Sequence, residues 1–320
     1  MTPYLLNITP LTAFGGALHG DTLFGQLCWT LAHRIGDATV SQLLQGYTNN
    51  QPFAVVSDAF PAGYLPKPHL PSNYFSPLAD ISQRKAAKEK IWLSAAVLKD
   101  NPSIAMNQLC NQYAKSNQEI GFESKQAHQP HNSINRLSNT TGEAGFTPYQ
   151  TEQHWYPQGS QLEVVVLIDT QRISATQIQQ AFEDIGMTGY GRDASIGLGK
   201  FRVNGFTPTQ LAHQPKATHY LSLANVAPQG LGFHEKNSFY KTFTRFGRHG
   251  SMAVSSGKPF KAPIMLATAA SVFAHDHQNA SYIGQGLGGL NSPISNHDAR
   301  TIHQGYAPVL QVRIEKEILA

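Results

Sequence analysis

The chain has 320 residues, 41% of them hydrophobic, which is enough to bury one large core or two medium ones. Only 14% of the residues are charged and the formal net charge is +4, so bulk electrostatics alone does not indicate a nucleic-acid binder. No apolar run reaches the roughly 18 residues of a membrane span and no basic segment precedes Tyr4–Leu18, which predicts a cytoplasmic protein without a membrane partner. Two cysteines exclude a disulfide framework.

The N-terminal part predicts a strand, a helix and a second strand. Tyr4–Thr9 reads as the first strand, Asp21 is expected to cap the helix, and Phe53–Ser57 reads as the second strand. The proline-rich segment Asp58–Pro68 excludes regular helix and predicts an ordered loop or edge segment. The expected core face of the helix consists of Leu23, Phe24, Leu27, Cys28 and Leu31.

The central part predicts a long functional insertion. A basic stretch, Gln83–Lys90, leads into Ile91–Leu98, after which hydrophobic periodicity fades between Asn101 and Gln158. Such a composition indicates that the segment cannot build a core of its own.

Regular structure returns after the insertion. Leu162–Ile168 predicts a buried strand, and Ser174 with Gln177 forms the capping box of a helix with core face Ile178, Ala181, Phe182 and Ile185. A glycine-rich loop, Gly186–Lys200, then leads into a strand at Phe201–Phe206. The order β-α-β, insertion, β-α-β is that of a ferredoxin-like unit, whose sheet often binds RNA.

The remaining part predicts a second, degenerate and β-rich unit with little helix. Its expected strands are His219–Val226, Phe239–Arg245, Ile264–Phe273 and Ala307–Ile314.

The glycine-rich loop is the most informative candidate site. Closely spaced glycines permit positive φ and close approach of a ligand, and they expose backbone amides to phosphates. A solvated connection is the simpler interpretation, and a dinucleotide fingerprint is rejected because this loop follows a helix and opens a strand. The candidate residues are Gly189, Gly191, Arg192, Ser195, Gly197, Gly199 and Lys200.

Two further segments suit nucleic-acid binding. Within the insertion, His131–Arg136 and Thr140–Tyr149 combine amides, Arg136 and aromatic rings that can stack on bases, although a disordered linker explains them too. The run Phe239–Arg248 offers Lys241, Arg245 and Arg248 as phosphate contacts, with an ordinary amphipathic strand nearly as plausible.

The 14 histidines raise the question of metal or acid–base chemistry. The closest pair, His275 and His277, has no third ligand nearby in sequence, so we expect no metal and no cofactor. His19 precedes the first helix, where a general base is able to reach a ribose 2′-hydroxyl, although such a residue more often packs or binds backbone.

Several motifs resemble one family in a specific order. They are Leu18–Gly25, Ser57–Pro61, Tyr64–Pro68, His131–Arg136, Thr140–Glu143 and the glycine-rich loop. The sequence resembles the guide-handle-binding subunit of type III-A (Csm) CRISPR effector complexes, within the RAMP superfamily. The resemblance spans residues 1–206 well and the remainder loosely.

The resemblance implies an α+β fold of two ferredoxin-like (RRM-like) domains, at residues 1–208 and 209–320, with a thumb insertion near 101–158. It also implies a non-catalytic subunit that binds the 5′ handle of the crRNA and bridges the large polymerase-like subunit to the repeating backbone subunit. Carried over by position, His19 and Asp21 lie at the first loop–helix junction, Arg136 lies in the thumb, and Gly189–Lys200 lie against the handle.

The sequence departs from the family where Asp193 follows Arg192 in the loop, and the role of the cluster Gly284–Gly289 is not assigned.

Two other functions are compatible with parts of the sequence. A metal-independent, guide-processing endoribonuclease of the same superfamily would use His19 as a general base. A small-molecule enzyme would need acidic or metal-binding partners beside the glycine-rich loop, which the sequence does not offer.

Overall fold

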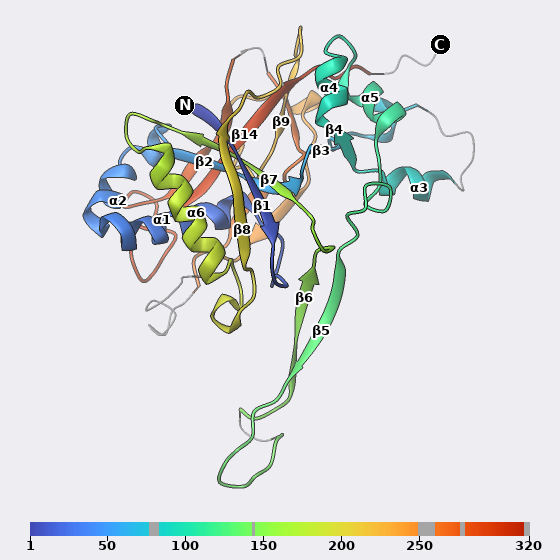
Figure 1. The fold of residues 1–320 in the computed structure, drawn as a ribbon. Helices are drawn as coiled ribbons and strands as arrows, with labels where there is room; N and C mark the ends of the chain where they lie inside the picture. The colour runs from blue at the N-terminus through green and yellow to red at the C-terminus, as the bar shows by residue number, and fades with distance from the viewer. Residues whose placement is uncertain (77–82, 143–144, 249–259, 276–278, 317–320) are drawn as a thin grey trace.

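The computed structural model describes residues 1–76, 83–142, 145–248, 260–275 and 279–316 (Figure 1). Within these ranges the chain forms a body of two four-stranded antiparallel sheets, from which a long hairpin projects. The helices are α1 (Gly20–Ile35), α2 (Asp37–Leu43), α3 (Gln83–Glu89), α4 (Ala95–Asp100), α5 (Met106–Tyr113) and α6 (Ala175–Thr188). None of the described helices is long and apolar enough to cross a membrane.

The first sheet has the strand order β2-β7-β1-β8, and all neighbouring strands are antiparallel. Helices α1 and α6 pack against each other and against this sheet, with α1 following β1 and α6 following β7. The predicted order β-α-β, insertion, β-α-β is therefore confirmed. The strands are β1 (Thr2–Pro10), β2 (Ala54–Pro61), β7 (Leu162–Ile168) and β8 (Phe201–Pro208).

The two main helices begin in different ways. At α6 the predicted capping box is confirmed, because Ser174 Oγ accepts the Gln177 amide and the Gln177 side chain accepts the Ser174 amide. The prediction that Asp21 caps α1 is wrong, since the helix begins at Gly20 with His19 as N-cap. The Gly20 amide instead donates to Asp58 Oδ1 of β2, 2.8 Å away.

The second sheet has the order β12-β9-β14-β13, and a separate two-stranded ribbon pairs β10 with β11. The predicted strand Ile264–Phe273 is wrong as a single element, because Ala270 has φ +68° and separates β11 from β12. The described residues after 208 contain no α-helix, in line with a β-rich unit. The strands are β9 (His219–Ser222), β10 (Thr242–Arg245), β11 (Ile264–Ala267), β12 (Val272–Ala274), β13 (Tyr282–Gly288) and β14 (Ile302–Val312).

The unassigned glycine cluster forms most of β13. A Cβ on Gly284 would lie 2.1 Å from the Gly305 carbonyl oxygen of β14, and one on Gly286 would lie 2.5 Å from that of Tyr47. These glycines therefore allow the strand to lie against neighbouring backbone.

The two sheets are joined by buried polar contacts. Gln304 of β14 accepts from the Val56 amide and donates to the Val56 carbonyl of β2, at 2.9 and 2.7 Å. Tyr306 of β14 donates to the Tyr47 carbonyl and belongs to the same apolar core as α1 and the first sheet. The first and second halves of the chain therefore share one interior.

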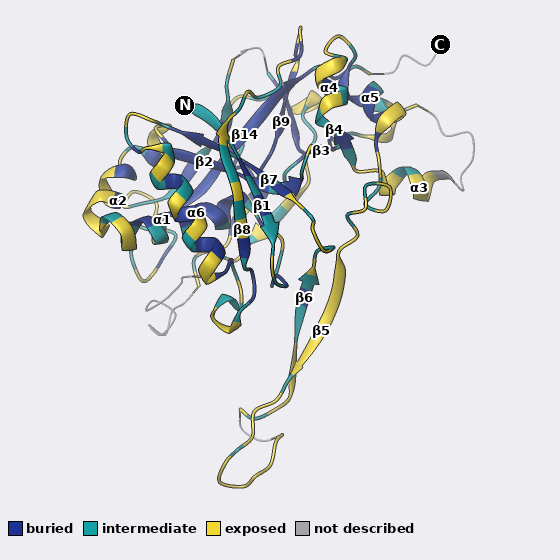
Figure 2. Ribbon diagram, viewed as in Figure 1, coloured by how far each residue is buried: buried dark blue, intermediate teal, exposed yellow. Residues whose placement is uncertain are grey.

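The insertion consists of two different parts. Residues 101–158 were expected to lack a core. Contrary to that expectation, the first part contains α5, whose Met106, Leu109 and Cys110 are buried against α4 and the second sheet. The second part is the antiparallel hairpin of β5 (Lys125–His131) and β6 (Tyr149–Trp155), which projects from the body with β5 largely exposed (Figure 2). Two short strands, β3 (Tyr64–Pro66) and β4 (Trp92–Ser94), pair beside α4 and α5.

Candidate nucleic-acid interface

The glycine-rich loop is fixed at both ends and open in the middle. Its five positive φ angles are +105° at Gly189, +74° at Gly191, +64° at Asp193, +98° at Gly197 and +73° at Gly199. A Cβ on Gly189 or Gly199 would lie 2.3 or 2.2 Å from a backbone carbonyl oxygen across the loop, whereas one on Gly191 or Gly197 would meet nothing within 4 Å. The outer glycines thus close the loop, and the inner two leave space where a ligand is able to approach.

Buried Tyr190 connects the loop to the start of α1. Its hydroxyl accepts the His19 amide and donates to the Ala17 carbonyl, both at 2.9 Å. Gln26 of α1 adds two more bonds, donating to the Gly189 carbonyl and accepting the Gly191 amide at 3.1 Å each. Four hydrogen bonds therefore join the loop to helix α1 and the segment just before it.

The middle of the loop faces outward and touches the base of the hairpin. The Arg192 side chain is 53% exposed, and its guanidinium donates to the Glu152 carbonyl of β6 at 2.7 Å and pairs with Asp193 at 3.3 Å. Ser195 is exposed, and the Lys200 backbone pairs with Leu11 and Thr12. The predicted loop residues are thus brought together, with Arg192 shared between loop and hairpin.

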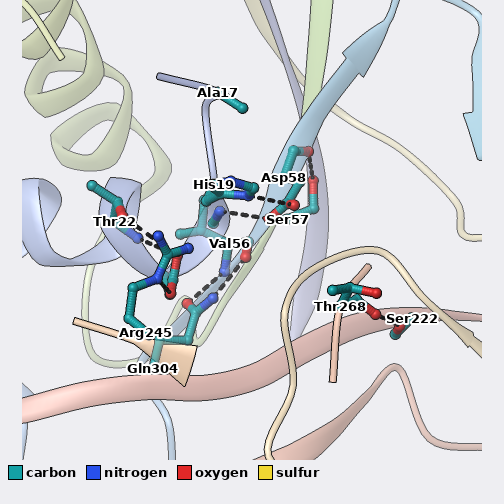
Figure 3. A network of polar contacts seen from close by, with 12 residues as sticks. Ala17, His19, Thr22, Val56, Ser57, Asp58, Ser222, Arg245, Thr268 and Gln304 are labelled. Atoms are coloured by element: carbon teal, nitrogen blue, oxygen red, sulfur yellow. Dashed lines mark hydrogen bonds and ion pairs between the residues drawn. The ribbon is translucent and has the colours of Figure 1, made fainter. Parts of the chain in front are cut away.

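His19 and Asp58 form a dyad at the helix start (Figure 3). Nδ1 of His19 lies 2.9 Å from Oδ2 of Asp58, whose other oxygen accepts the Gly20 amide. Burial alone would lower the pKa of His19, but the hydrogen bond and charge of Asp58 outweigh it, and the pKa is raised above 6.5. The His19 side chain remains 34% exposed, so a protonated imidazole is accessible to an anionic ligand.

Asp21 occupies the buried side of the same helix turn. Its fully buried carboxylate takes two bonds from Arg245 of β10, at 2.8 and 3.0 Å, and lies 3.3 Å from His303 Nε2 of β14. Burial would raise the pKa of Asp21, yet His303 and Arg245 hold it far below its usual range. The carboxylate is fully engaged with the protein, and Arg245 keeps only 20% of its side chain exposed.

The other predicted cations lie apart from the loop. Arg136 is exposed in the segment between β5 and β6, and exposed Lys241 precedes β10. Arg248 lies 5.8 Å from the Phe260 ring centroid in a cation–π contact. Arg245, which was expected to share a face with Lys241, turns inward to Asp21.

Sequence reasoning missed the residues that position these groups. Asp58 had been noted only within a family motif, and Tyr190, Gln26 and His303 had no assigned role. A carboxylate inside a buried strand is a signal for Asp58, whereas partners more than 150 residues away leave no local pattern.

No group of three or more potential metal ligands occurs among the described residues. His275 is described, whereas His277 lies outside the described residues. The glycine-rich loop follows α6 and opens β8, so the context that rejected a dinucleotide fingerprint is confirmed.

Comparison with known proteins gives a likeness of fold. No protein-family model matches the sequence, and no curated protein matches it significantly. A chain from the crystal structure of a Csm1-Csm4 cassette in complex with pppApA is 13% identical, with a TM-score of 0.59, covering 99% of this chain and 100% of that one. A chain from a Csm3-Csm4 subcomplex of the type III-A CRISPR-Cas interference complex is 13% identical, with a TM-score of 0.61, covering 98% and 100%.

The chain therefore has the same fold as chains in these two type III-A structures. Csm4 is the component that both structures have in common, and it recurs in a Csm1-Csm4 cassette with cA4, at 14% identity and a TM-score of 0.57. The likeness of fold therefore runs through structures that share this component.

Proposed function

We propose that this chain is a non-catalytic, RNA-binding subunit of a type III CRISPR effector complex that holds the 5′ handle of the crRNA. In this proposal it bridges a large polymerase-like subunit and the repeating backbone subunit, as the pairing of Csm4 with Csm1 and with Csm3 in solved structures suggests. Residues 1–208 and 209–320 are proposed as two ferredoxin-like domains, the second of them degenerate.

One observation carries the proposal, namely the open glycine-rich loop held against the His19 helix start by Tyr190. Gly191 and Gly197 leave room for a sugar-phosphate backbone, and Arg192 and Ser195 offer donors beside it. His19 adds a positive charge when protonated, and charge-assisted hydrogen bonds to phosphate are the stronger kind. These groups bind a phosphate chain without reading much base identity.

The remaining predicted residues take two kinds of role in this proposal. Lys200, Lys241, Arg248 and Arg136 contact RNA directly, Arg136 from the hairpin that serves as the thumb. Asp21 and Arg245 act indirectly, since their mutual ion pair holds the helix start against β10.

The state of His19 favours binding over cleavage. A general base must be neutral to take a proton, whereas the hydrogen bond and charge of Asp58 outweigh burial and raise the pKa of His19, which favours its charged form. Even so, the dyad with Asp58 resembles the way enzymes orient a catalytic histidine, so the endoribonuclease alternative needs a direct test.

The test combines binding and cleavage in one preparation. The full chain is titrated with labelled handle RNA and with a scrambled RNA of equal length, and the products are then examined on a denaturing gel. Tight handle binding with intact RNA supports the proposal. RNA cleaved in wild type but intact with His19→Ala would establish the endoribonuclease instead.

A matched pair of variants locates the site. Gly197 and Gly230 both have positive φ, +98° and +74°, and open surroundings, so valine imposes a similar backbone strain at each. Gly197→Val is expected to abolish handle binding while Gly230→Val retains it. Normal binding by a folded Gly197→Val variant would remove the loop from the site.

A further inference from the structure

A second feature, remote from the glycine-rich loop, is a large cleft beside β3 and β4. It has a volume of about 1950 Å³ and lies between this strand pair, helix α3 and the segment that leads into β10. None of its lining residues belongs to the glycine-rich loop, which lies at the end of α6 on the other side of the sheets (Figure 1).

The charge of this cleft is almost entirely positive. A single acidic residue, Glu235, faces five cations, and among the described residues none of the five forms an ion pair with a carboxylate. The cations are Lys67, Arg84, Lys88, Lys90 and Lys241.

The cations act on one another and on a neighbouring histidine. Burial lowers the pKa of Lys67, and the charge of Lys90 lowers it further. Burial and the charge of Lys241 together lower the pKa of His69 to about 4. Positive potential thus accumulates in the cleft, which an anionic ligand would relieve.

Aromatic rings line the same cleft. Lys67 Nζ lies 4.3 Å from the Phe75 ring centroid, and Trp92, Phe239 and Tyr240 also line the cleft. Tyr240 is 50% exposed. Basic residues interleaved with aromatic rings are the usual construction of a groove for single-stranded nucleic acid, in which phosphates meet cations and bases stack on rings.

The size of the cleft favours an extended ligand over a small metabolite. Pockets for small molecules measure about 300–1,000 Å³, well below this volume. From charge, rings and size together we infer that the cleft binds a single-stranded RNA segment, distinct from the segment held by the glycine-rich loop. The inference rests on the proposed function only in taking RNA as the nucleic acid.

The first experiment measures RNA affinity with a charge-reversal pair. Lys88→Glu/Lys90→Glu is compared with Lys99→Glu/Lys216→Glu, since all four lysines are exposed and both doubles change the net charge equally. The probe is fluorescein-labelled oligouridine of about 20 nucleotides, longer than one groove needs. Each lost phosphate contact lowers the slope of log affinity against log salt concentration by roughly 0.7. Losing two contacts should therefore lower that slope by about 1.4 and the affinity at 0.15 M salt about tenfold.

The control double is expected to keep the slope of the wild type. Equal slopes for both doubles would overturn the inference. A poly-glutamate peptide provides a second check. If the peptide binds wild type but binds Lys88→Glu/Lys90→Glu more weakly, while oligouridine binds both equally, the cleft is a protein-docking site and the inference is overturned.

The second experiment locates the RNA and separates this inference from the proposed function. Oligouridine containing 4-thiouridine is cross-linked to the full chain, and peptides from residues 64–76 or 238–241 are expected to carry the adduct. Adducts confined to the glycine-rich loop and the hairpin would overturn the inference. If a folded Gly197→Val variant still binds handle RNA normally while cleft adducts form, the handle function of the loop fails and the cleft site stands.

Discussion

Replacing Asp21 by asparagine tests the buried ion pair that fixes the start of α1. The change keeps the shape of the side chain but leaves the Arg245 guanidinium, 20% exposed, without its carboxylate. Removing one partner of a buried pair costs about 3–5 kcal/mol, and the residual exposure of Arg245 places this case near 3 kcal/mol. With an unfolding entropy of about 2.1 cal/mol/K per residue, the 320-residue chain should lose about 4 °C in melting temperature.

Calorimetry or circular dichroism measures this shift, and Asp298→Asn is the control. Asp298 pairs with Arg300 at the surface, where the two side chains are 39% and 73% exposed, so replacing Asp298 should leave the melting temperature unchanged. Asp21→Asn/Arg245→Gln should recover part of the loss, because no uncompensated charge remains. A midpoint for Asp21→Asn within about 1 °C of wild type would refute the account.

The same variant has a pH signature. The folded pKa of Asp21 is depressed, so its contribution to stability is present above the usual carboxyl pKa of about 3.9 and is lost as pH falls toward the folded value. The difference in free energy of unfolding between wild type and Asp21→Asn should therefore become smaller as the pH is lowered. A difference that stays constant at acidic pH would contradict the depressed pKa of Asp21.

Three other predictions concern the loop, the dyad and the hairpin. Gly199→Ala should lower the melting temperature more than Gly197→Ala, because a Cβ at 199 would lie 2.2 Å from a carbonyl oxygen whereas a Cβ at 197 would meet nothing within 4 Å. Equal losses of melting temperature would contradict the packing argument. Handle affinity should fall as pH rises through the raised pKa of His19, and Asp58→Asn should move that midpoint to lower pH in anisotropy titrations. Arg136→Ala should lower the log-log salt slope by roughly 0.7 for handle and scrambled RNA alike, and an unchanged slope would remove it from the phosphate contacts.

Local patterns predicted the first sheet and its helices well. Alternating or continuous apolar runs identified β1 and β7, and the Ser174–Gln177 box located the start of α6 to the residue. Each of these signals involves residues only a few positions apart, so it can be recognised from the sequence alone.

Elements stabilised by distant contacts were harder to predict. Helix α5 was missed because its three buried apolar residues lie in a short polar run and pack on the second sheet. Strand β13 was missed because glycine is normally depleted in strands, whereas here it permits backbone contact with β14.

The candidate site was predicted in composition but not in arrangement. The loop glycines and His19 were identified, yet the inward turn of Arg245 depends on Asp21, which lies 224 residues earlier in the chain. Which glycines close the loop and which leave it open is likewise decided by backbone on the opposite side of the loop.

The bulge in β2 has a consequence for the order of folding. The register of β2 shifts between Val56 and Ala59, and the backbone groups there find partners in the C-terminal half, Val56 with Gln304 and the Asp58 amide with the Leu223 carbonyl. On the ribosome, these partners are synthesised long after the strand itself. Strand β2, and with it the carboxylate that orients His19, should reach its final geometry only when nearly the whole chain has emerged.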